Sequence, residues 1–185
     1  MNKDLTEAQK DYAHFLPALS GFYATYVGKQ RHPDPDTGEL YVPDDRIPSN
    51  FQNNVESLNY LNLQEGQFQY KWTLYSAGHA ELDTTKFSPK EDMVRNRDRD
   101  NTWLLGDSGG FQIGKGVWEG DWKDPNCPKA QKKRDGVLRW MDAYMDYGMI
   151  LDIPAWVARS PAGAKATGIS TVSYTHLTLP TTPYV

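Results

Sequence analysis

The sequence is poor in cysteine and contains no long apolar run. Of its 185 residues only Cys127 is a cysteine, which excludes an intrachain disulfide and is typical of a reducing compartment. No apolar stretch approaches the roughly 20 residues that cross a bilayer, and residues 1–7 (MNKDLTE) lack the apolar core of a signal peptide. These absences predict a soluble, cytoplasmic protein with no membrane partner.

The chain also has little positive charge, because 20 lysine and arginine residues face 24 acidic ones and the formal net charge is −4. Nucleic-acid-binding proteins usually present a basic surface, so the average composition does not indicate such a partner. Two local basic groups depart from this average. A solvated charged face is the commoner role for such groups, and phosphate contact is the alternative. The groups are Arg95, Arg97 and Arg99, and Lys129, Lys132, Lys133 and Arg134.

The most informative segment is residues 107–112, which follow the apolar run 103–105. The apolar run predicts a strand, and the two glycines predict a turn that presents a carboxylate, a hydroxyl and an amide together. Such a polar cluster suits the recognition of a polar ligand. Its members are Asp107, Ser108, Gly109, Gly110, Phe111 and Gln112.

A second carboxylate follows another apolar run. Residues 149–151 come after Gly148 and are consistent with a buried parallel strand, and Asp152 stands at its carboxyl end before Pro154. Between the two strands, six apolar residues recur at helical spacing: Val137, Leu138, Trp140, Met141, Tyr144 and Met145. Strand, helix and strand form a βαβ unit, which predicts an α/β fold with a parallel sheet and a site at the carboxyl ends of the strands.

The first hundred residues carry weaker signals. The apolar spacing between Tyr12 and Tyr23 predicts an amphipathic helix, opened by Pro17 and ended near Gly21. Residues 39–42 form a possible short strand, and residues 68–75 form a further strand that is followed by a turn at Gly78 and His79.

One alternative interpretation of the motif is a serine protease. Residues 106–110 (GDSGG) resemble the segment around the nucleophilic serine of chymotrypsin-like proteases. However, His79 and Ser108 lie only 29 positions apart, too few for the domain that separates these residues in such enzymes, and Phe111 stands where the protease motif has proline. The spacing argues against this alternative.

The strand, turn and polar cluster at 107–112 resemble the substrate-base motif of tRNA-guanine transglycosylases, which exchange a guanine in a nucleic acid for a 7-deazaguanine. The resemblance implies a (β/α)₈ TIM barrel, of which this chain is expected to be a partial version truncated on its C-terminal side. It also implies that Asp107 is catalytic and that Asp107 and Asp152 bind the heterocycle of the exchanged base. The other substrate-binding positions are then Ser108, Gly109, Gly110, Phe111 and Gln112.

The mechanism implied by the resemblance is a double displacement at the ribose, in which an aspartate on a later strand attacks and the incoming base displaces it. No such segment follows Asp152, and one cysteine cannot build the family's structural zinc site of three cysteines and a histidine. A barrel also needs roughly 250 residues. We therefore expect residues 1–171 to be the N-terminal portion of the barrel domain, inactive alone and without a cofactor, the zinc belonging to the part beyond it. The threonine-rich residues 172–185 are expected to be a non-native tail that resembles translated adapter sequence.

The polymer that holds the exchanged base is left open. The residues Leu105 and Gly106 before the motif and the segment 116–133 diverge from the tRNA enzymes in a way typical of the phage branch, which modifies DNA. The expected partners are therefore tRNA or DNA and guanine or a 7-deazaguanine, with a homodimer possible for the full-length protein. One alternative is a non-catalytic purine or nucleic-acid binding protein, and a second is a glycoside hydrolase that uses Asp107 and Asp152 as its acid and base.

Overall fold

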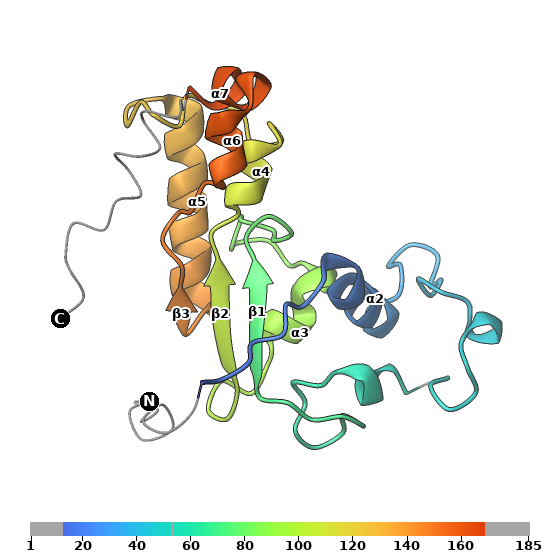
Figure 1. Ribbon diagram of the computed structural model, residues 1–185. Helices are drawn as coiled ribbons and strands as arrows, with labels where there is room; N and C mark the ends of the chain where they lie inside the picture. The colour runs from blue at the N-terminus through green and yellow to red at the C-terminus, as the bar shows by residue number, and fades with distance from the viewer. Residues whose placement is uncertain (1–12, 53, 169–185) are drawn as a thin grey trace.

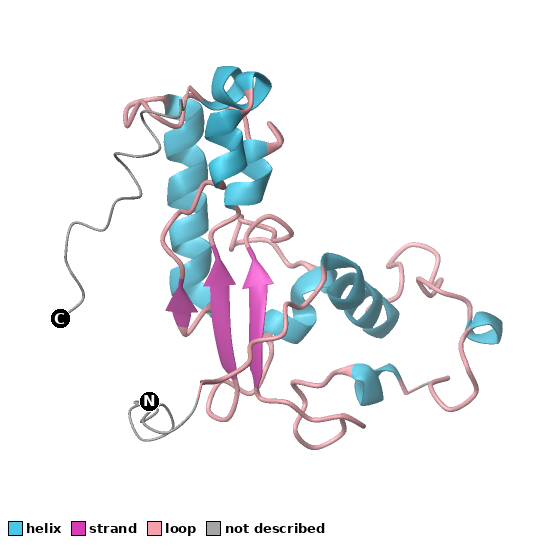
Figure 2. Ribbon diagram, viewed as in Figure 1, coloured by secondary structure: helices cyan, strands magenta, loops and turns pink. Residues whose placement is uncertain are grey.

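The computed structural model describes residues 13–52 and 54–168, and at their centre lies a small parallel sheet. Its strands are β1 (Trp72–Ser76), β2 (Trp103–Asp107) and β3 (Tyr147–Gly148), hydrogen-bonded in that order. Figures 1 and 2 show the three arrows side by side and pointing the same way. The predicted parallel sheet and the strand before Asp107 are confirmed, and the described chain has a mixed α/β architecture.

The helices are mostly short, and the segment between the first of them and β1 consists largely of loops (Figure 2). The α-helices are α2 (Gly21–Arg31), α3 (Asp92–Arg95), α4 (Gly110–Gly114), α5 (Pro128–Tyr144), α6 (Ala155–Arg159) and α7 (Pro161–Thr167). The 3₁₀ helices are η1 (Asp44–Arg46), η2 (Val55–Leu58) and η3 (Pro89–Glu91). The expected tail at 172–185 lies outside the described residues.

The predicted helix before β3 is confirmed as α5, which begins at Pro128, well before the expected apolar face. Trp140 is completely buried and Val137 nearly so, whereas Leu138 is 64% exposed and does not belong to the buried face. A β-carbon at Gly106 of β2 would lie 2.7 Å from the Met145 side chain, so α5 packs closely on this glycine. The covered face of β2 therefore carries Leu104 and Gly106, and alternation places Asp107 on the opposite face.

The prediction for the N-terminal segment is wrong: residues 13–20 are extended and the helix α2 begins, rather than ends, at Gly21. Ala18 forms a parallel bridge with Leu74 of β1. Ser20 caps the helix, its Oγ accepting from the Tyr23 N–H at 3.1 Å. The apolar spacing was misleading because a serine cap and Pro17 favour an extended entry to the helix. Tyr12 lies outside the described residues.

The possible strand at 39–42 is also wrong, because this segment is a loop. The buried side chain of Gln30 takes the place of a neighbouring strand: it donates to the Val42 carbonyl at 2.8 Å and accepts from the Val42 N–H at 3.0 Å. A side chain therefore satisfies the backbone groups that would otherwise need a sheet partner. The strand expected at 68–75 is confirmed in its second half as β1, and the turn at Gly78 and His79 follows it.

The buried strand predicted at 149–151 is a further error. Pairing with β2 ends at Gly148, after which the Met149 N–H makes one more bond, 2.8 Å long, to the Gly106 carbonyl. Ile150 is 92% exposed, and Leu151 and Asp152 are exposed as well. Hydrophobicity alone could not separate a buried strand from an exposed apolar loop, because burial depends on what covers the segment. Asp152 therefore lies in a loop rather than at a strand end.

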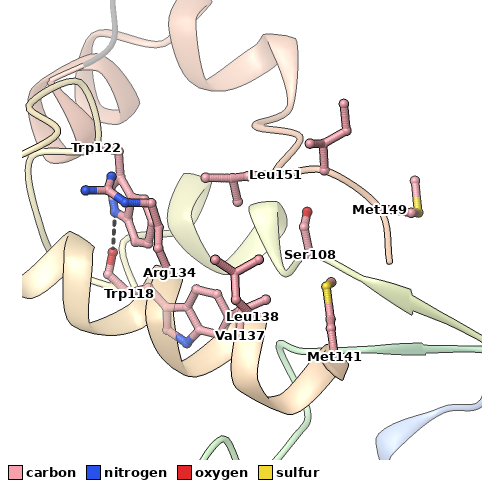
Figure 3. Close-up of a pocket in the computed structure, with 10 residues that line it drawn as sticks. Ser108, Trp118, Trp122, Arg134, Val137, Leu138, Met141, Met149 and Leu151 are labelled. Carbon is pink, nitrogen blue, oxygen red and sulfur yellow. Dashed lines mark hydrogen bonds between the residues drawn. The ribbon is translucent and has the colours of Figure 1, made fainter. Parts of the chain in front are cut away.

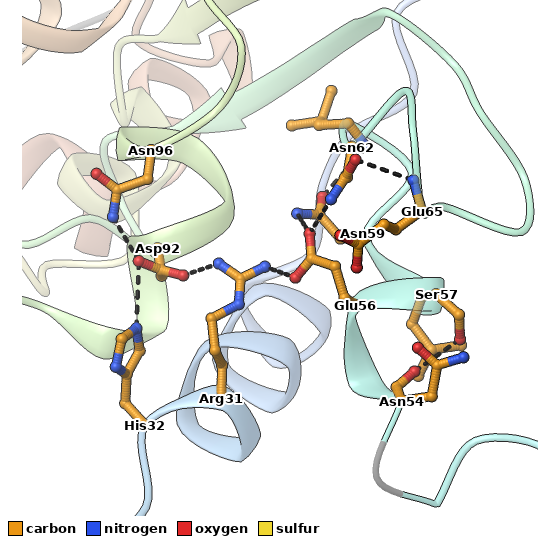
Figure 4. Close-up of polar contacts among 12 residues, drawn as sticks. Arg31, His32, Asn54, Glu56, Ser57, Asn59, Asn62, Glu65, Asp92 and Asn96 are labelled. Carbon is orange, nitrogen blue, oxygen red and sulfur yellow. Dashed lines mark hydrogen bonds and ion pairs between the residues drawn. The ribbon is translucent and has the colours of Figure 1, made fainter.

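A polar network attaches the loop-rich segment to the helices near β1 (Figure 4). Arg31, at the end of α2, forms ion pairs with Glu56 of η2 and with Asp92 of α3. Asp92, which is 3% exposed, also accepts a hydrogen bond from the Asn96 amide at 2.5 Å. Because one buried carboxylate joins both helices, the network fixes α2 against α3. Separately, none of the helices in residues 13–52 and 54–168 is long and apolar enough to cross a membrane.

Candidate functional site

The carboxyl ends of β1 and β2 bring Ser76 and Asp107 together on the face of the sheet that α5 leaves uncovered. The two residues are direct partners in the strand register. Ser76 Oγ donates to Asp107 Oδ2 at 2.6 Å and accepts from the Gly78 N–H at 3.2 Å. A short hydroxyl-to-carboxylate bond of this kind fixes the direction in which the remaining carboxylate oxygen points.

Gln112, on α4, packs its amide group on Gly78, the residue whose N–H bonds to Ser76. A β-carbon at Gly78 would overlap the Gln112 amide group, so glycine alone permits this contact. The Oε1 atom of Gln112 is buried and has no hydrogen-bond partner among the described residues. Because an unpaired buried acceptor is costly, this atom marks a position where a donor on a ligand would be stabilising.

Each of the two glycines in the motif is required for a different structural reason. Gly109 adopts a left-handed conformation with φ 78°, and a β-carbon there would lie 2.5 Å from the Trp118 ring. At Gly110 a β-carbon would overlap the Asp152 carbonyl oxygen, which is backbone and cannot rotate away. The glycines thus allow the indole ring and the loop after β3 to approach the turn closely.

Asp152 reaches the motif through its backbone. Its N–H donates to Ser108 Oγ at 3.2 Å, and its carbonyl packs on Gly110. Its side chain is exposed, and its carboxylate makes no hydrogen bond or ion pair to any residue that the structure describes. The two predicted aspartates thus lie on segments that touch, but only Asp107 is held by a side-chain partner.

Ser108 is 2% exposed and lines a cavity of about 220 Å³ between α5 and the loop after β3 (Figure 3). The cavity is apolar apart from this hydroxyl and the Arg134 guanidinium, and neither Asp107 nor Gln112 lines it. Its other lining residues are Trp118, Trp122, Val137, Leu138, Met141, Met149, Ile150 and Leu151. Ser108 therefore holds the loop and faces this cavity, while Asp107 bonds to Ser76.

Phe111, the second residue of α4, is exposed to solvent. Its side chain is 55% exposed, and its ring meets that of Trp156 edge-on with 6.1 Å between the ring centres. An exposed aromatic ring two positions from the left-handed glycine is available for stacking with a planar ligand.

Sequence reasoning did not assign Ser76 and Gly78 to the site. The available signal was their position at the end of a predicted strand, since the carboxyl ends of neighbouring parallel strands meet at one edge. The ring of His79 lies about 3.1 Å from the position of a β-carbon on Gly21. This contact gives His79 a packing role beneath the start of α2.

The two basic groups differ in their contacts. The Arg97 side chain is fully buried and paired with Asp146 at 2.9 Å, so it cannot contact phosphates. Lys129 pairs with Glu119 at 2.8 Å in an exposed position. Lys133 and Arg134 lie over the rings of Trp118 and Trp122, at 5.0 and 5.9 Å from their centres. Several of these lysine and arginine side chains are thus engaged in contacts with other residues of the chain.

Cys127 precedes α5, and backbone N–H groups of Ala130 and Asp121 that point at its sulfur lower the pKa of the thiol from its usual 9.0. A lowered pKa gives the folded state more thiolate between its own pKa and the usual 9.0, and the difference fades as the pH rises past 9.0 and the thiol ionises in both states. We expect alkylation of the folded protein by iodoacetamide to reach half its maximal rate at a lower pH than alkylation of the same chain in urea. Coincident pH profiles would contradict the expectation.

The described ranges contain no cluster of three histidine, cysteine, aspartate or glutamate side chains that could hold a metal ion. The geometry instead offers an oriented carboxylate, a buried amide oxygen without a partner and an exposed aromatic ring at one edge of the sheet. Comparison with protein-family models, curated proteins and solved structures yields no match for this chain, so its function is inferred from this site.

Proposed function

We propose that this chain carries the base-binding part of a glycosyltransferase that replaces guanine in tRNA or DNA with a 7-deazaguanine. The observation that carries the proposal is that two acceptors meet at Gly78. Ser76, which holds the Asp107 carboxylate, accepts from the Gly78 N–H, and the unpartnered, buried Oε1 of Gln112 packs on the same glycine. The edge of guanine presents adjacent N–H donors, and a carboxylate can accept two of them while an amide oxygen accepts another.

We further propose that the sheet belongs to a (β/α)₈ barrel. The bridge at Ala18, then β1, β2 and β3, follow one another in chain order across the sheet, as the strands of a barrel do. The uncovered face carries side chains in layers: Trp72 pairs with Trp103, Leu74 with Leu105 and Ser76 with Asp107. Layers of inward-facing side chains below a site at the carboxyl ends are a feature of barrels.

In this proposal the described residues bind and orient the base. Asp107 accepts its N–H groups, Gln112 supplies a second acceptor, and the exposed ring of Phe111 stacks on the heterocycle. The resemblance to the transglycosylases assigns the carboxylate that attacks the ribose to a later strand. The chain alone is therefore expected to bind guanine weakly without exchanging it.

Asp107→Asn is expected to weaken guanine binding at least tenfold, because hydrogen bonds to a charged acceptor contribute about 1.5–3 kcal/mol. Ser76→Ala, which frees the carboxylate to rotate, is expected to weaken it less. Saturation-transfer NMR with free guanine as a function of its concentration measures both effects. Asp100→Asn removes a carboxylate from an exposed turn and serves as the control.

Three results would count against the proposal. Equal affinity of the Asp107→Asn variant and the parent chain for guanine would remove Asp107 from the site. Incorporation of labelled guanine into nucleic acid by the purified 185-residue chain would show that the attacking carboxylate lies within it. Guanine binding by a complete gene product that never exchanges the base would favour the non-catalytic binding protein instead.

A further inference from the structure

A surface that combines exposed aromatic rings with cations, the α4–α6 surface, lies beyond the carboxyl end of β2, where α4, α6 and α7 gather (Figure 1). It is formed by residues 108–118 and 155–167, which contain three cations, Lys115, Arg159 and Lys165, and no aspartate or glutamate. Two aspartates border it, Asp152 at Gly110 and Asp121 at Gly168. The whole chain has a net charge of −4, so this surface opposes the average charge of the protein. A local excess of positive charge is complementary to a polyanion.

Exposed aromatic rings accompany these cations. Trp156 is 40% exposed, beside the exposed ring of Phe111. Lys115 Nζ lies 5.5 Å from the centre of the phenyl ring and 5.4 Å from that of the indole. In the described ranges no carboxylate forms an ion pair with Lys115. Aromatic rings combined with unpaired cations are the means by which proteins hold single-stranded nucleic acids.

The two rings project from closely packed helices, α4 and α6, rather than from a loop. Val157 is completely buried, and a β-carbon at Gly114 would overlap its side chain and approach the Trp156 ring to 2.9 Å. The helices α4 and α6 are thus in close contact, which fixes the position of the indole. Arg159 lies three residues after Trp156 on α6, so both side chains project from the same side of that helix.

We propose that this surface binds an unpaired nucleic-acid strand next to the exchanged base, with a neighbouring base stacked on Trp156 and phosphates on Lys115 and Arg159. The inference rests on the proposed function, since it continues the base site at Phe111 along the strand. A base that is exchanged must leave its stack, so the adjoining nucleotides need a place to be held. The surface can nevertheless be tested without guanine.

The test is fluorescence anisotropy of the full chain with a labelled oligothymidylate of about 12 nucleotides, which contains no guanine. Trp156→Ala is expected to weaken binding at least about fivefold, and Trp156→Phe, which keeps a ring, to restore most of it. Lys115→Gln is expected to weaken binding about threefold and to reduce the slope of log K against log salt by about 0.7.

Lys29→Gln provides a matched control. Lys29 also lies over an aromatic ring, 5.0 Å from the centre of Tyr41, but on α2 and outside the α4–α6 surface. Its loss removes the same charge, so an equal effect of the two lysine substitutions would overturn the proposal. A failure of the parent chain to bind, or equal binding of poly-glutamate, would overturn it too.

Oligouridylate and a blunt DNA duplex complete the experiment. A higher affinity for either single strand than for the duplex supports the proposal, and the preferred strand shows whether the surface favours deoxyribose or ribose. A higher affinity for the duplex overturns the proposal. Guanine binding measured separately distinguishes the two hypotheses. If Trp156→Ala keeps guanine binding but loses the oligothymidylate, the strand surface is separate from the base site.

Discussion

Replacement of Glu91 by alanine is expected to lower the free energy of unfolding by about 3–5 kcal/mol, because it leaves a buried cation without its partner. Glu91 is completely buried. Its carboxylate accepts from Arg95 at 2.9 Å, from the indole N–H of Trp140 at 3.0 Å and from the Glu81 backbone at 2.9 Å. Alanine would leave the indole and the Glu81 N–H without this acceptor, would leave Arg95 with only backbone carbonyls as acceptors, and would open a gap between η3 and α5. Urea unfolding followed by tryptophan fluorescence measures the loss.

Two further variants make this result interpretable. Glu91→Gln keeps one acceptor oxygen, for the indole, and fills the same space, but it loses the charge and turns an amide NH2 towards the other two donors. A smaller loss of stability than for Glu91→Ala is expected, in a protein that still folds. Glu119→Ala breaks the exposed pair with Lys129 and is expected to leave the urea midpoint unchanged, because solvent screens that pair. Similar midpoints for Glu91→Ala and the parent chain would show that the buried carboxylate does not hold α5.

A pair of glycine-to-alanine substitutions in helices is expected to change stability in opposite directions. Gly28 in α2 is buried, and a β-carbon there would overlap the carbonyl oxygen of Pro89 in η3. Because the obstacle is backbone, no side-chain rotation relieves it, and we expect Gly28→Ala to cost about 3 kcal/mol.

In Gly136→Ala, by contrast, the new methyl group meets the Leu82 side chain at 3.5 Å, an ordinary contact. Alanine is favoured over glycine inside a helix by roughly 0.5–1 kcal/mol, so this variant is expected to be more stable than the parent chain. Urea unfolding of both variants under one condition provides the comparison. Equal changes of the same sign would mean that α2 does not pack on η3 as closely as described.

The local sequence pattern was sufficient to predict part of the fold and part of the site. The strand before Asp107, the turn of Gly109 and Gly110, and the buried stripe of α5 around Trp140 follow from hydrophobic spacing and glycine chemistry within a few residues. The same pattern failed at Gly21 and at Ile150, where one helix cap and one uncovered loop decided the outcome. The spacing of apolar residues indicates neither a helix cap nor whether another segment covers a loop.

The sequence by itself determined that a carboxylate, a hydroxyl and an amide follow a strand in a tight turn, because the strand and its glycines are local properties of residues 103–112. Only the tertiary structure decided which groups meet there. Ser76 reaches Asp107 from 31 residues away through the register of two parallel strands. Lys115 lies between two exposed rings because α6 returns to pack on α4. Contacts between distant segments depend on the packing of the whole chain, and no short stretch of sequence encodes them.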